Sequence, residues 1–446
     1  DDRGNPSKTI YPDGTFDSME YDAEGQVVAS IDRAGRTTSP EYDAAGRVIK
    51  TTAADGSFST NAYDVAGRLT SVTDALGNTT SYVYDELGRR TKTIDALGNE
   101  TVFVYDDLGR RTQSTDALGR VTHFEYNVLG NLTKTTFDNG TFTSTVYDEL
   151  SRKVSETDLG GRTTSYEYSN AGNLSAVVDS LNQRTEYDYD QRGNKIAQTD
   201  ANGNTTVWSY DELGRVSSRS LPMGELETYA YDSRGNMESK TDFNGDTTIY
   251  EYNNLNQLIK TTYADGNTVE NTYTILGQME TVTETNGTTS YTYDINNRLT
   301  RIDYPTGNYI AYSYDLNGNR IGLETANQII AYTFDALNRM STVTSVDGIT
   351  SYTYDAVGNR ATQTNANGTT ATYTYDNLNR LIDLTHTNSA NTVIASYAYT
   401  LGANGNRLSI TEATGRIVDY TYDDLYRLIT ETVTDPINGK IGRAHV

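Results

Sequence analysis

The sequence predicts an all-β protein built from tandem β-hairpins, and three observations support this. A tyrosine recurs with an unbroken period of 21 residues from Tyr21 to Tyr273. Two glycine-containing turns, about ten residues apart, follow most of these tyrosines. No stretch carries a sustained apolar period of 3.6, so helix should be nearly absent. A fixed period of this length is typical of arrays in which each unit is one supersecondary element.

The recurring tyrosine, here called the anchor, marks each repeat. It stands at 13 positions in strict register, and the spacing then loosens. The later anchors are Tyr293, Tyr314, Phe334, Tyr354, Tyr375, Tyr399 and Tyr422. The chain therefore contains about twenty repeats, which we assign to residues 1–440.

The repeat from Tyr63 to Tyr84 shows the expected elements. Asp64-Val65-Ala66-Gly67, the anchor turn, is typical of a type I turn with glycine in the left-handed position. Residues 68–73 form a strand by their β-branched content. Residues 74–78 form the mid-repeat turn, and residues 79–84 form the second strand. Each repeat should therefore contain two short antiparallel strands and two turns.

Glycine supplies the positive φ that both turns require. We expect this structural role at a set of glycines that share the turn pattern. In anchor turns these are Gly67, Gly88, Gly109, Gly193 and Gly214, and in mid-repeat turns they are Gly77, Gly98, Gly119 and Gly203.

A ladder of aromatic side chains should line one face of the sheet. The position two residues before the anchor is aromatic in 15 of 20 repeats, and a spacing of two places both rings on one face. The anchor should lie opposite the residue six positions later, which is apolar in 13 repeats and basic in six. Such cross-strand pairs stabilise sheets. The predicted ladder comprises Tyr63, Tyr82, Tyr84, Tyr105, Tyr147, Tyr166, Tyr187, Tyr189, Trp208, Tyr210, Tyr229, Tyr231, Tyr291, Tyr293, Tyr314, Tyr352, Tyr354, Tyr373 and Tyr375.

Composition limits the classes of function. Apolar residues make up 35% of the 446 residues, which disfavours a thick core. The net charge of −24 argues against nucleic acid or an anionic membrane as a partner. There are no cysteines, and no apolar run approaches the length of a membrane span.

No residue pattern predicts an enzyme, a metal site or a cofactor. The aspartates occur once per turn rather than in a dense calcium loop, and aspartate is a preferred first residue of a type I turn. Every repeat offers the same carboxylate, so no catalytic pair is distinguished. His123, His386 and His445 are scattered. Trp208 could be a ligand platform, but its position in the ladder favours a structural role.

These motifs resemble the YD repeat of RHS-repeat proteins. Three close matches are Tyr84-Asp85-Glu86-Leu87-Gly88-Arg89, Tyr105-Asp106-Asp107-Leu108-Gly109-Arg110 and Tyr210-Asp211-Glu212-Leu213-Gly214-Arg215. The resemblance implies hairpins wound into a spiral sheet that forms part of a hollow shell. In bacterial members this shell encloses a C-terminal toxin, and in the teneurins it belongs to an adhesion receptor. The implied partner is a C-terminal toxin domain of the same protein or a second shell protein, in a secreted or cell-surface bacterial setting.

Departures from the family pattern limit what can be carried over. The core segment and self-cleavage site of toxin-bearing members are absent from the sequence, so no catalytic residue is assigned. An alternative function is a surface adhesin that contacts carbohydrate or a neighbouring cell. We expect the array to be truncated at both ends, and residues 441–446 to be read-through from a sequencing adapter.

Overall fold

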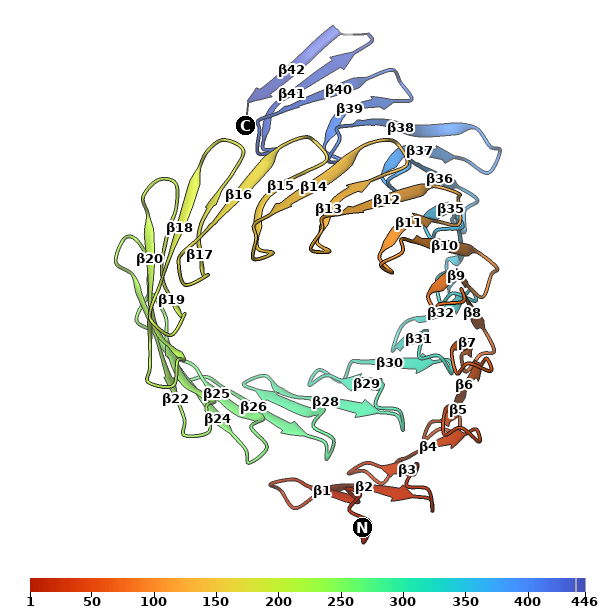
Figure 1. The fold of residues 1–446 in the computed structure, drawn as a ribbon, viewed down its shortest axis with the longest axis vertical. Helices are drawn as coiled ribbons and strands as arrows, with labels where there is room; N and C mark the ends of the chain where they lie inside the picture. The colour runs from red at the N-terminus through yellow and green to blue at the C-terminus, as the bar shows by residue number, and fades with distance from the viewer. Residues whose placement is uncertain (438, 446) are drawn as a thin grey trace. The chain divides into compact units, whose positions relative to one another are not determined.

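The computed structural model describes residues 1–437 and 439–445, and these residues form 42 β-strands and no helix (Figure 1). The prediction of an all-β fold is confirmed. The chain divides into two compact units, each made of two segments that are distant in sequence. Unit 1 comprises residues 1–82 and 206–339, and unit 2 comprises residues 83–205 and 340–446.

The strands of unit 1 are mostly five or six residues long, as expected for half-repeats of about ten residues. They are β1 (Lys8–Ile10), β2 (Phe16–Tyr21), β3 (Val27–Ile31), β4 (Thr37–Tyr42), β5 (Val48–Thr52), β6 (Phe58–Tyr63), β7 (Leu69–Thr73), β21 (Val216–Ser220), β22 (Leu226–Tyr231), β23 (Met237–Thr241), β24 (Thr247–Tyr252), β25 (Leu258–Thr262), β26 (Thr268–Tyr273), β27 (Met279–Glu284), β28 (Gly287–Tyr293), β29 (Leu299–Asp303), β30 (Tyr309–Tyr314), β31 (Arg320–Thr325) and β32 (Ile329–Phe334). Two further strands, β8 (Thr79–Tyr84) and β20 (Thr205–Tyr210), contain a unit boundary.

Unit 2 has the same organisation, with longer strands toward its end. Its strands are β9 (Arg90–Ile94), β10 (Glu100–Tyr105), β11 (Arg111–Thr115), β12 (Val121–Tyr126), β13 (Leu132–Thr136), β14 (Phe142–Tyr147), β15 (Lys153–Thr157), β16 (Thr163–Tyr168), β17 (Leu174–Val178), β18 (Arg184–Tyr189), β19 (Lys195–Thr199), β33 (Met340–Ser345), β34 (Gly348–Tyr354), β35 (Arg360–Thr364), β36 (Thr370–Tyr375), β37 (Leu381–Thr387), β38 (Val393–Leu401), β39 (Arg407–Glu412), β40 (Ile417–Tyr422), β41 (Leu428–Asp435) and β42 (Gly439–His445).

Within each segment, neighbouring strands pair antiparallel as a meander. The predicted register is confirmed: Tyr105 of β10 lies opposite Arg111 of β11, six residues later. The register shifts between Val104 and Tyr105, which is the bulge expected beside a three-residue hairpin loop. The same shift recurs at anchor after anchor, for example at Tyr63 and Tyr314.

Tyr399 is an exception, and its assignment as an anchor is wrong. Strand β38 continues to Leu401, and it is Leu401 that lies opposite the residue six positions later, Arg407. Tyr399 instead lies two residues before Leu401, the last residue of the strand. The lengthened repeat thus shifted the aromatic residue away from the strand end.

In most repeats both turns have the same geometry, whereas the mid-repeat turns between Glu284 and Gly287 and between Ser345 and Gly348 are two-residue loops. In the anchor turn after Tyr84, the Gly88 N–H donates to the Asp85 carbonyl at 3.0 Å, and the Asp85 N–H donates to the Arg89 carbonyl at 3.0 Å. The nine glycines predicted for turns have φ between 78° and 88°, in the left-handed region that a side chain disfavours.

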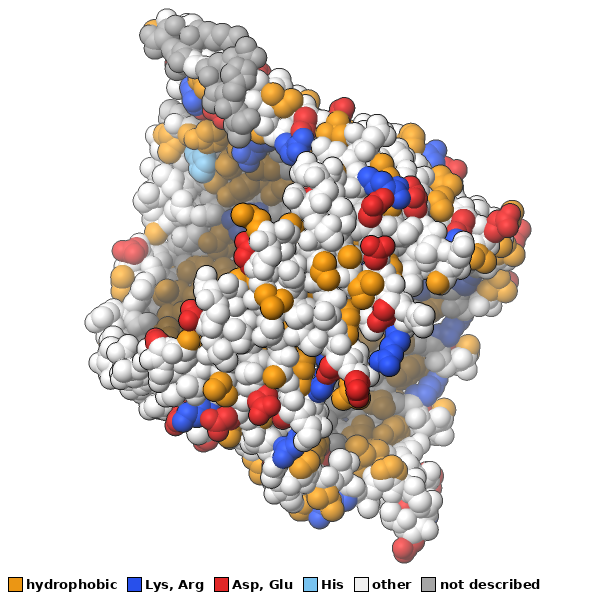
Figure 2. Space-filling model, turned by 90° about the vertical axis from the view of Figure 1, so that its left-hand side faces the viewer, with side chains coloured by type: hydrophobic (Ala, Val, Ile, Leu, Met, Phe, Trp, Pro, Cys, Tyr) orange, Lys and Arg blue, Asp and Glu red, His pale blue; other side chains and the backbone are white. Residues whose placement is uncertain are grey.

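The sheet has no conventional core. Among the described residues no large side chain is fully buried, and the buried apolar residues are Ala29, Ala176, Ala371 and Val418. Figure 2 shows hydrophobic side chains dispersed among polar and charged ones on the face that it presents. The stability of the fold must therefore depend on contacts that repeat along the chain rather than on a central cluster.

Residues 441–445 continue β42, which pairs antiparallel with β41. Their pairing does not test whether they derive from an adapter, so that assignment stays a prediction. Val446 lies outside the described residues.

Candidate functional site

The anchor turn is the most regular chemical unit of the chain. One carboxylate oxygen of Asp85 accepts the backbone N–H groups of Leu87 and Arg89, at 3.0 and 2.9 Å. Its other oxygen accepts Nε of Arg89 at 2.7 Å. Aspartate and arginine at the two ends of the loop therefore close the turn with side chains as well as backbone.

The same arginine reaches the next repeat. Arg89 donates from Nη1 to the carbonyl of Asp106 at 2.8 Å, and its guanidinium lies 5.2 Å from the centre of the Tyr105 ring. The Tyr105 hydroxyl in turn donates to the carbonyl of Arg90 at 2.8 Å. Asp85, Arg89 and Tyr105 thus join two successive repeats, and we call this set the repeat clamp.

The repeat clamp recurs along both units. Each instance places an arginine over the anchor of the following repeat, at 4.5 to 5.2 Å from the ring centre. The pairs are Arg47 with Tyr63, Arg89 with Tyr105, Arg110 with Tyr126, Arg152 with Tyr168, Arg215 with Tyr231, and Arg298 with Tyr314. A cation over an aromatic ring contributes roughly 0.5–1 kcal/mol at such exposed positions. The total stabilisation from these contacts therefore increases with the number of repeats.

Three aspartates of anchor turns, Asp64, Asp148 and Asp211, have a pKa below the ordinary value. The pKa of Asp211 lies below its ordinary value because the carboxylate accepts the backbone N–H of Arg215 and also the Arg215 guanidinium. Asp64 and Asp148 show the same shift, with the backbone N–H of the arginine as the largest cause. Hydrogen bonds to a carboxylate favour its ionised form.

The predicted ladder residues lie where the register requires. The anchors end their strands, and the second aromatic precedes each anchor by two residues. All nineteen predicted members, including Trp208, are half-buried, while the residue between the two aromatic positions is exposed in each of these repeats. Their role in stabilising the array stays a proposal, as does the role of the nine turn glycines.

The ladder residue Tyr229 belongs to a charged cluster around Glu227. Glu227 of β22 is 3% exposed and pairs with Lys240 at 2.5 Å and Arg219 at 3.0 Å. The Tyr229 hydroxyl donates to the same carboxylate at 2.5 Å. Burial, followed by the bond to Glu227, raises the pKa of Tyr229 to about 12. Both carboxylate oxygens are already paired, so this cluster is an ion-pair network within the sheet.

Within each unit, mid-repeat turns of the first segment contact anchor turns of the second segment. We call this line of contacts the seam. One kind of seam contact is an arginine that follows the turn glycine and donates to a backbone carbonyl and to the side chain of a left-handed asparagine. In unit 1 Arg36 donates to Ile295 at 2.9 Å and Asn297 at 2.6 Å, and in unit 2 Arg120 donates to Asp376 at 3.3 Å and Asn379 at 3.0 Å.

The second kind of seam contact joins an asparagine of the later segment to a carboxylate of the earlier one. The asparagine is always a donor through Nδ2, and the acceptor is always a mid-repeat aspartate. The pairs are Asn296 with Asp55, Asn317 with Asp74 at 2.6 Å, Asn377 with Asp138 at 2.8 Å, and Asn404 with Asp158 at 2.6 Å.

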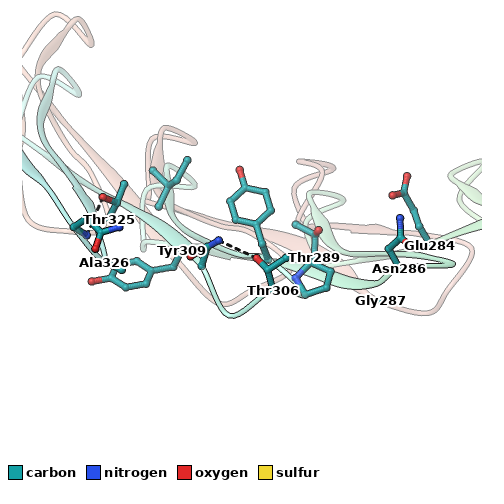
Figure 3. Close-up of a pocket in the computed structure, with 13 residues that line it drawn as sticks. Glu284, Asn286, Gly287, Thr289, Thr306, Tyr309, Thr325 and Ala326 are labelled. Carbon is teal, nitrogen blue, oxygen red and sulfur yellow. Dashed lines mark hydrogen bonds between the residues drawn. The ribbon is translucent and has the colours of Figure 1, made fainter.

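A groove of about 710 Å³ lies along the mid-repeat turns of unit 1 between β27 and β32. Figure 3 shows its labelled residues spread along this edge of the sheet, from Glu284 to Ala326. Tyr304 is 37% exposed beside it. Tyr309 is held in place, since its hydroxyl donates to Glu324 at 2.9 Å and Arg301 lies 4.0 Å from its ring centre. The groove therefore combines an exposed aromatic side chain with amide and hydroxyl groups.

The described part of the chain offers no metal centre. It contains no group of three or more His, Cys, Asp or Glu side chains that could hold a metal ion. Nor do residues 1–437 and 439–445 contain a helix that could span a membrane.

Sequence reasoning missed two features of the site. It treated the arginine after the turn glycine as part of a motif without assigning it a contact. It did not predict the seam, whose partners are about 240 to 260 residues apart. The signal that could have found it is the asparagine at the left-handed position of later anchor turns, as at Asn297 and Asn379.

Comparisons with solved structures identify the fold. The chain aligns with two crystal structures titled TcdB2-TccC3-Cdc42 and TcdB2-TccC3, each with a TM-score of 0.68 and 17% identity. It also aligns with the Tc holotoxin pore of Photorhabdus luminescens, with a TM-score of 0.60 and 14% identity. These alignments cover 94%, 99% and 97% of this chain but only 28%, 30% and 30% of those chains. The chain therefore spans less than a third of the proteins that it resembles.

The sequence comparison points the same way. No curated protein sequence matches the chain. The profile described as RHS Repeat matches ten stretches, which together cover more than half of the chain: 21–57, 63–100, 105–141, 168–205, 189–224, 210–247, 231–268, 334–370, 354–393 and 403–436. Because these matches cover more than half of the chain, they show that it belongs to the RHS-repeat family.

Proposed function

We propose that this chain is a segment of the wall of an RHS-repeat shell that sequesters a polypeptide cargo, namely a toxin domain of the same protein. The seam is the observation that carries the proposal. A wall must close laterally as well as along the strands, and seam hydrogen bonds join the turn edges of two segments in each unit. The fold shared with the crystal structures of TcdB2-TccC3 supports this function.

The role is structural rather than enzymatic in this proposal. The charged groups of the repeat are used in turns: Asp85 and Arg89 satisfy each other and the backbone. A wall made in this way separates its contents from solvent through paired strands. We further propose that the assembly acts outside the bacterial cell, as a secreted or surface-associated protein.

Protease protection tests sequestration. The coding sequence downstream of this chain would be recovered from its source locus and expressed with it as one protein. We expect the downstream domain to resist proteinase K in this protein and to be digested rapidly when expressed alone. Equal digestion rates would contradict sequestration.

Seam variants sharpen this test. Replacing Arg36 and Arg120 by alanine should expose the cargo, because both side chains join segments across a seam. Arg416→Ala is the matched control, since Arg416 pairs with Glu412 of its own turn. If the control exposes the cargo as much as the seam variants do, the seam is not what closes the wall.

Small-angle scattering tests the shell directly. We expect the pair-distance distribution of the chain to have its maximum at longer distances than that of a solid particle of the same maximum dimension, as for a hollow object. The distribution of a compact solid globule would refute the proposal that residues 1–440 form part of a shell.

The groove of unit 1 favours a second candidate function, adhesion through carbohydrate. An exposed tyrosine beside amide groups suits the apolar face and hydroxyls of a sugar. A glycan array with the full chain would test this, with Tyr304→Ala expected to abolish binding. Tyr263→Ala is the control, because Tyr263 is 46% exposed and also begins a mid-repeat turn of unit 1 but does not line the groove. Binding that survives Tyr304→Ala would exclude this groove.

A further inference from the structure

Two departures from the repeat meet at one point of the unit 2 seam. Tyr426 stands where other anchor turns carry glycine, asparagine or serine, in the sequence Asp423-Asp424-Leu425-Tyr426-Arg427. Gly160 adds a second glycine to the mid-repeat turn Asp158-Leu159-Gly160-Gly161-Arg162. These positions are 266 residues apart in sequence, yet their side chain and backbone are in contact.

Tyr426 is held in an unfavourable backbone conformation. Its φ is 60°, and the other non-glycine residues with positive φ among the described residues are asparagine or serine. A bulky side chain disfavours this region because Cβ approaches the backbone. Such strain persists only where surrounding contacts compensate for it.

The compensating contacts come from the other segment. The Tyr426 hydroxyl donates to the Asp158 carboxylate at 3.1 Å. The guanidinium of Arg162 lies 3.5 Å from the centre of the Tyr426 ring. Arg162 also donates to the carbonyl of Asp423 at 2.9 Å, so it binds the backbone of the same anchor turn.

Gly160 makes room for the ring. A Cβ at position 160 would overlap the Tyr426 hydroxyl, so any other residue there would displace the side chain. The Gly160 N–H is also used, since it donates to Asp158 at 2.8 Å and to Asn404 at 3.1 Å. In the corresponding turn position of other repeats stand Leu76, Leu97 and Leu118, about half exposed.

We propose that Tyr426 is a docking side chain and that the turn 158–162 is its receptor. Together they determine which anchor turn of segment 340–446 lies on which mid-repeat turn of segment 83–205. The arginine and asparagine contacts of the seam are repeated and therefore permit the segments to slide by whole repeats. The tyrosine fits only a turn with glycine at its third position, so it fixes one register. This role concerns recognition between segments and does not depend on a cargo.

The substitution Tyr426→Gly distinguishes two cases: either Tyr426 stabilises the seam through its contacts, or the turn only accommodates a tyrosine at this position without benefit from it. Glycine is the residue that the repeat uses, and it relieves the left-handed strain. If Tyr426 docks, amide hydrogen exchange at residues 158–162 in the full chain should accelerate at least tenfold despite this relief. If the variant is instead more stable, with exchange at 158–162 unchanged, the proposal is overturned.

Two further variants complete the test. Asn256→Gly changes another left-handed anchor-turn residue, one outside the unit 2 seam, and should leave exchange at 158–162 as in the parent. Gly160→Ala should reproduce the effect of Tyr426→Gly, and the double variant should exchange no faster than either single one. If Gly160→Ala does not fold, Tyr426→Phe, which removes only the hydroxyl bond to Asp158, should still accelerate exchange at Gly160. An unchanged rate there would contradict the proposal.

Discussion

The seams of the two units follow one rule but differ at one place. Both use an arginine that reaches a left-handed asparagine, Arg36 to Asn297 in unit 1 and Arg120 to Asn379 in unit 2. Both also use asparagine donors to turn aspartates. Unit 2 adds Tyr426, with Asp158 and Arg162 around it. From this difference we infer that the repeated arginine and asparagine contacts hold the two segments of a unit together. The single contact of Tyr426 determines which turns of the two segments in unit 2 lie against each other.

The largest expected effect tests whether the two units are equivalent apart from the seam. Tyr105→Ala in unit 2 and Tyr314→Ala in unit 1 should each lower the free energy of unfolding by up to about 3 kcal/mol. A fully buried aromatic costs about 3–5 kcal/mol on truncation, and these rings are only half-buried. Each substitution also removes the hydrogen bond from the tyrosine hydroxyl to a backbone carbonyl, at 2.8 Å for Tyr105 and 2.7 Å for Tyr314.

Urea denaturation would measure these costs, and hydrogen exchange would show where the damage lies. Loss of protection should concentrate in the repeats adjacent to the substitution, because each repeat contacts its neighbours. Uniform loss along the whole chain would show that the repeats do not behave as a nearest-neighbour array.

A smaller effect concerns the left-handed turn position, at which the N-terminal repeats mostly have glycine and several later repeats have asparagine. Gly109 has φ of 80°, and a Cβ added there would meet open space, so a substitution tests the backbone alone. Gly109→Val should cost about 2 kcal/mol, since the left-handed conformation costs roughly 1–2 kcal/mol even for ordinary side chains. Gly109→Asn should cost less than about 1 kcal/mol, because asparagine tolerates this region. Equal costs in thermal unfolding would mean that the strain is not at this residue.

The seam arginines should contribute less again. Arg120→Ala should lower the free energy of unfolding by about 1 kcal/mol, the usual net value of a hydrogen bond. Arg36→Ala should do the same in unit 1. Arg416→Ala is the control in a turn that makes its ion pair internally with Glu412. If exchange in segment 340–446 responds equally to Arg120→Ala and Arg416→Ala, the seam contacts contribute nothing measurable.

The smallest effect is expected in acid. The pKa of Asp55 lies below its ordinary value, chiefly because its carboxylate accepts the Ser57 hydroxyl, and Asn296 donates to it across the seam. A carboxyl whose folded pKa is lowered contributes stability above its unfolded value, near pH 4, and loses it as the pH falls through the folded value. Exchange protection in turn 53–57 should therefore fall progressively as the pH is lowered below about 5.

A turn without a carboxylate provides the comparison for the acid experiment. The mid-repeat turn 365–369 contains Asn365 and Asn367 instead of aspartate, so its protection should change less over the same pH range. A parallel decline in both turns would show that acid acts on the sheet as a whole rather than on the turn carboxylates.

The local structure of this protein could be predicted from its sequence because the contacts that form each turn and hairpin lie within a single repeat. Gly88 and Asp85 close their turn with partners within four residues, so a local pattern suffices to predict it. The pairing of Tyr105 with Arg111 follows from the loop length between them. The error at Tyr399 arose where the period broke, because counting residues no longer located the turn.

The tertiary structure alone decided which distant turns meet. Asn404 reaches Asp158, and Tyr426 reaches the same carboxylate, across more than 240 residues. The period of 21 residues does not determine how many repeats separate two turns that meet at the seam. That number depends on the accumulated twist and curvature of many paired strands. The sequence by itself therefore determined the repeating hairpin, its turns and its aromatic face. The seam and its docking tyrosine became visible only when strands distant in sequence were placed in space.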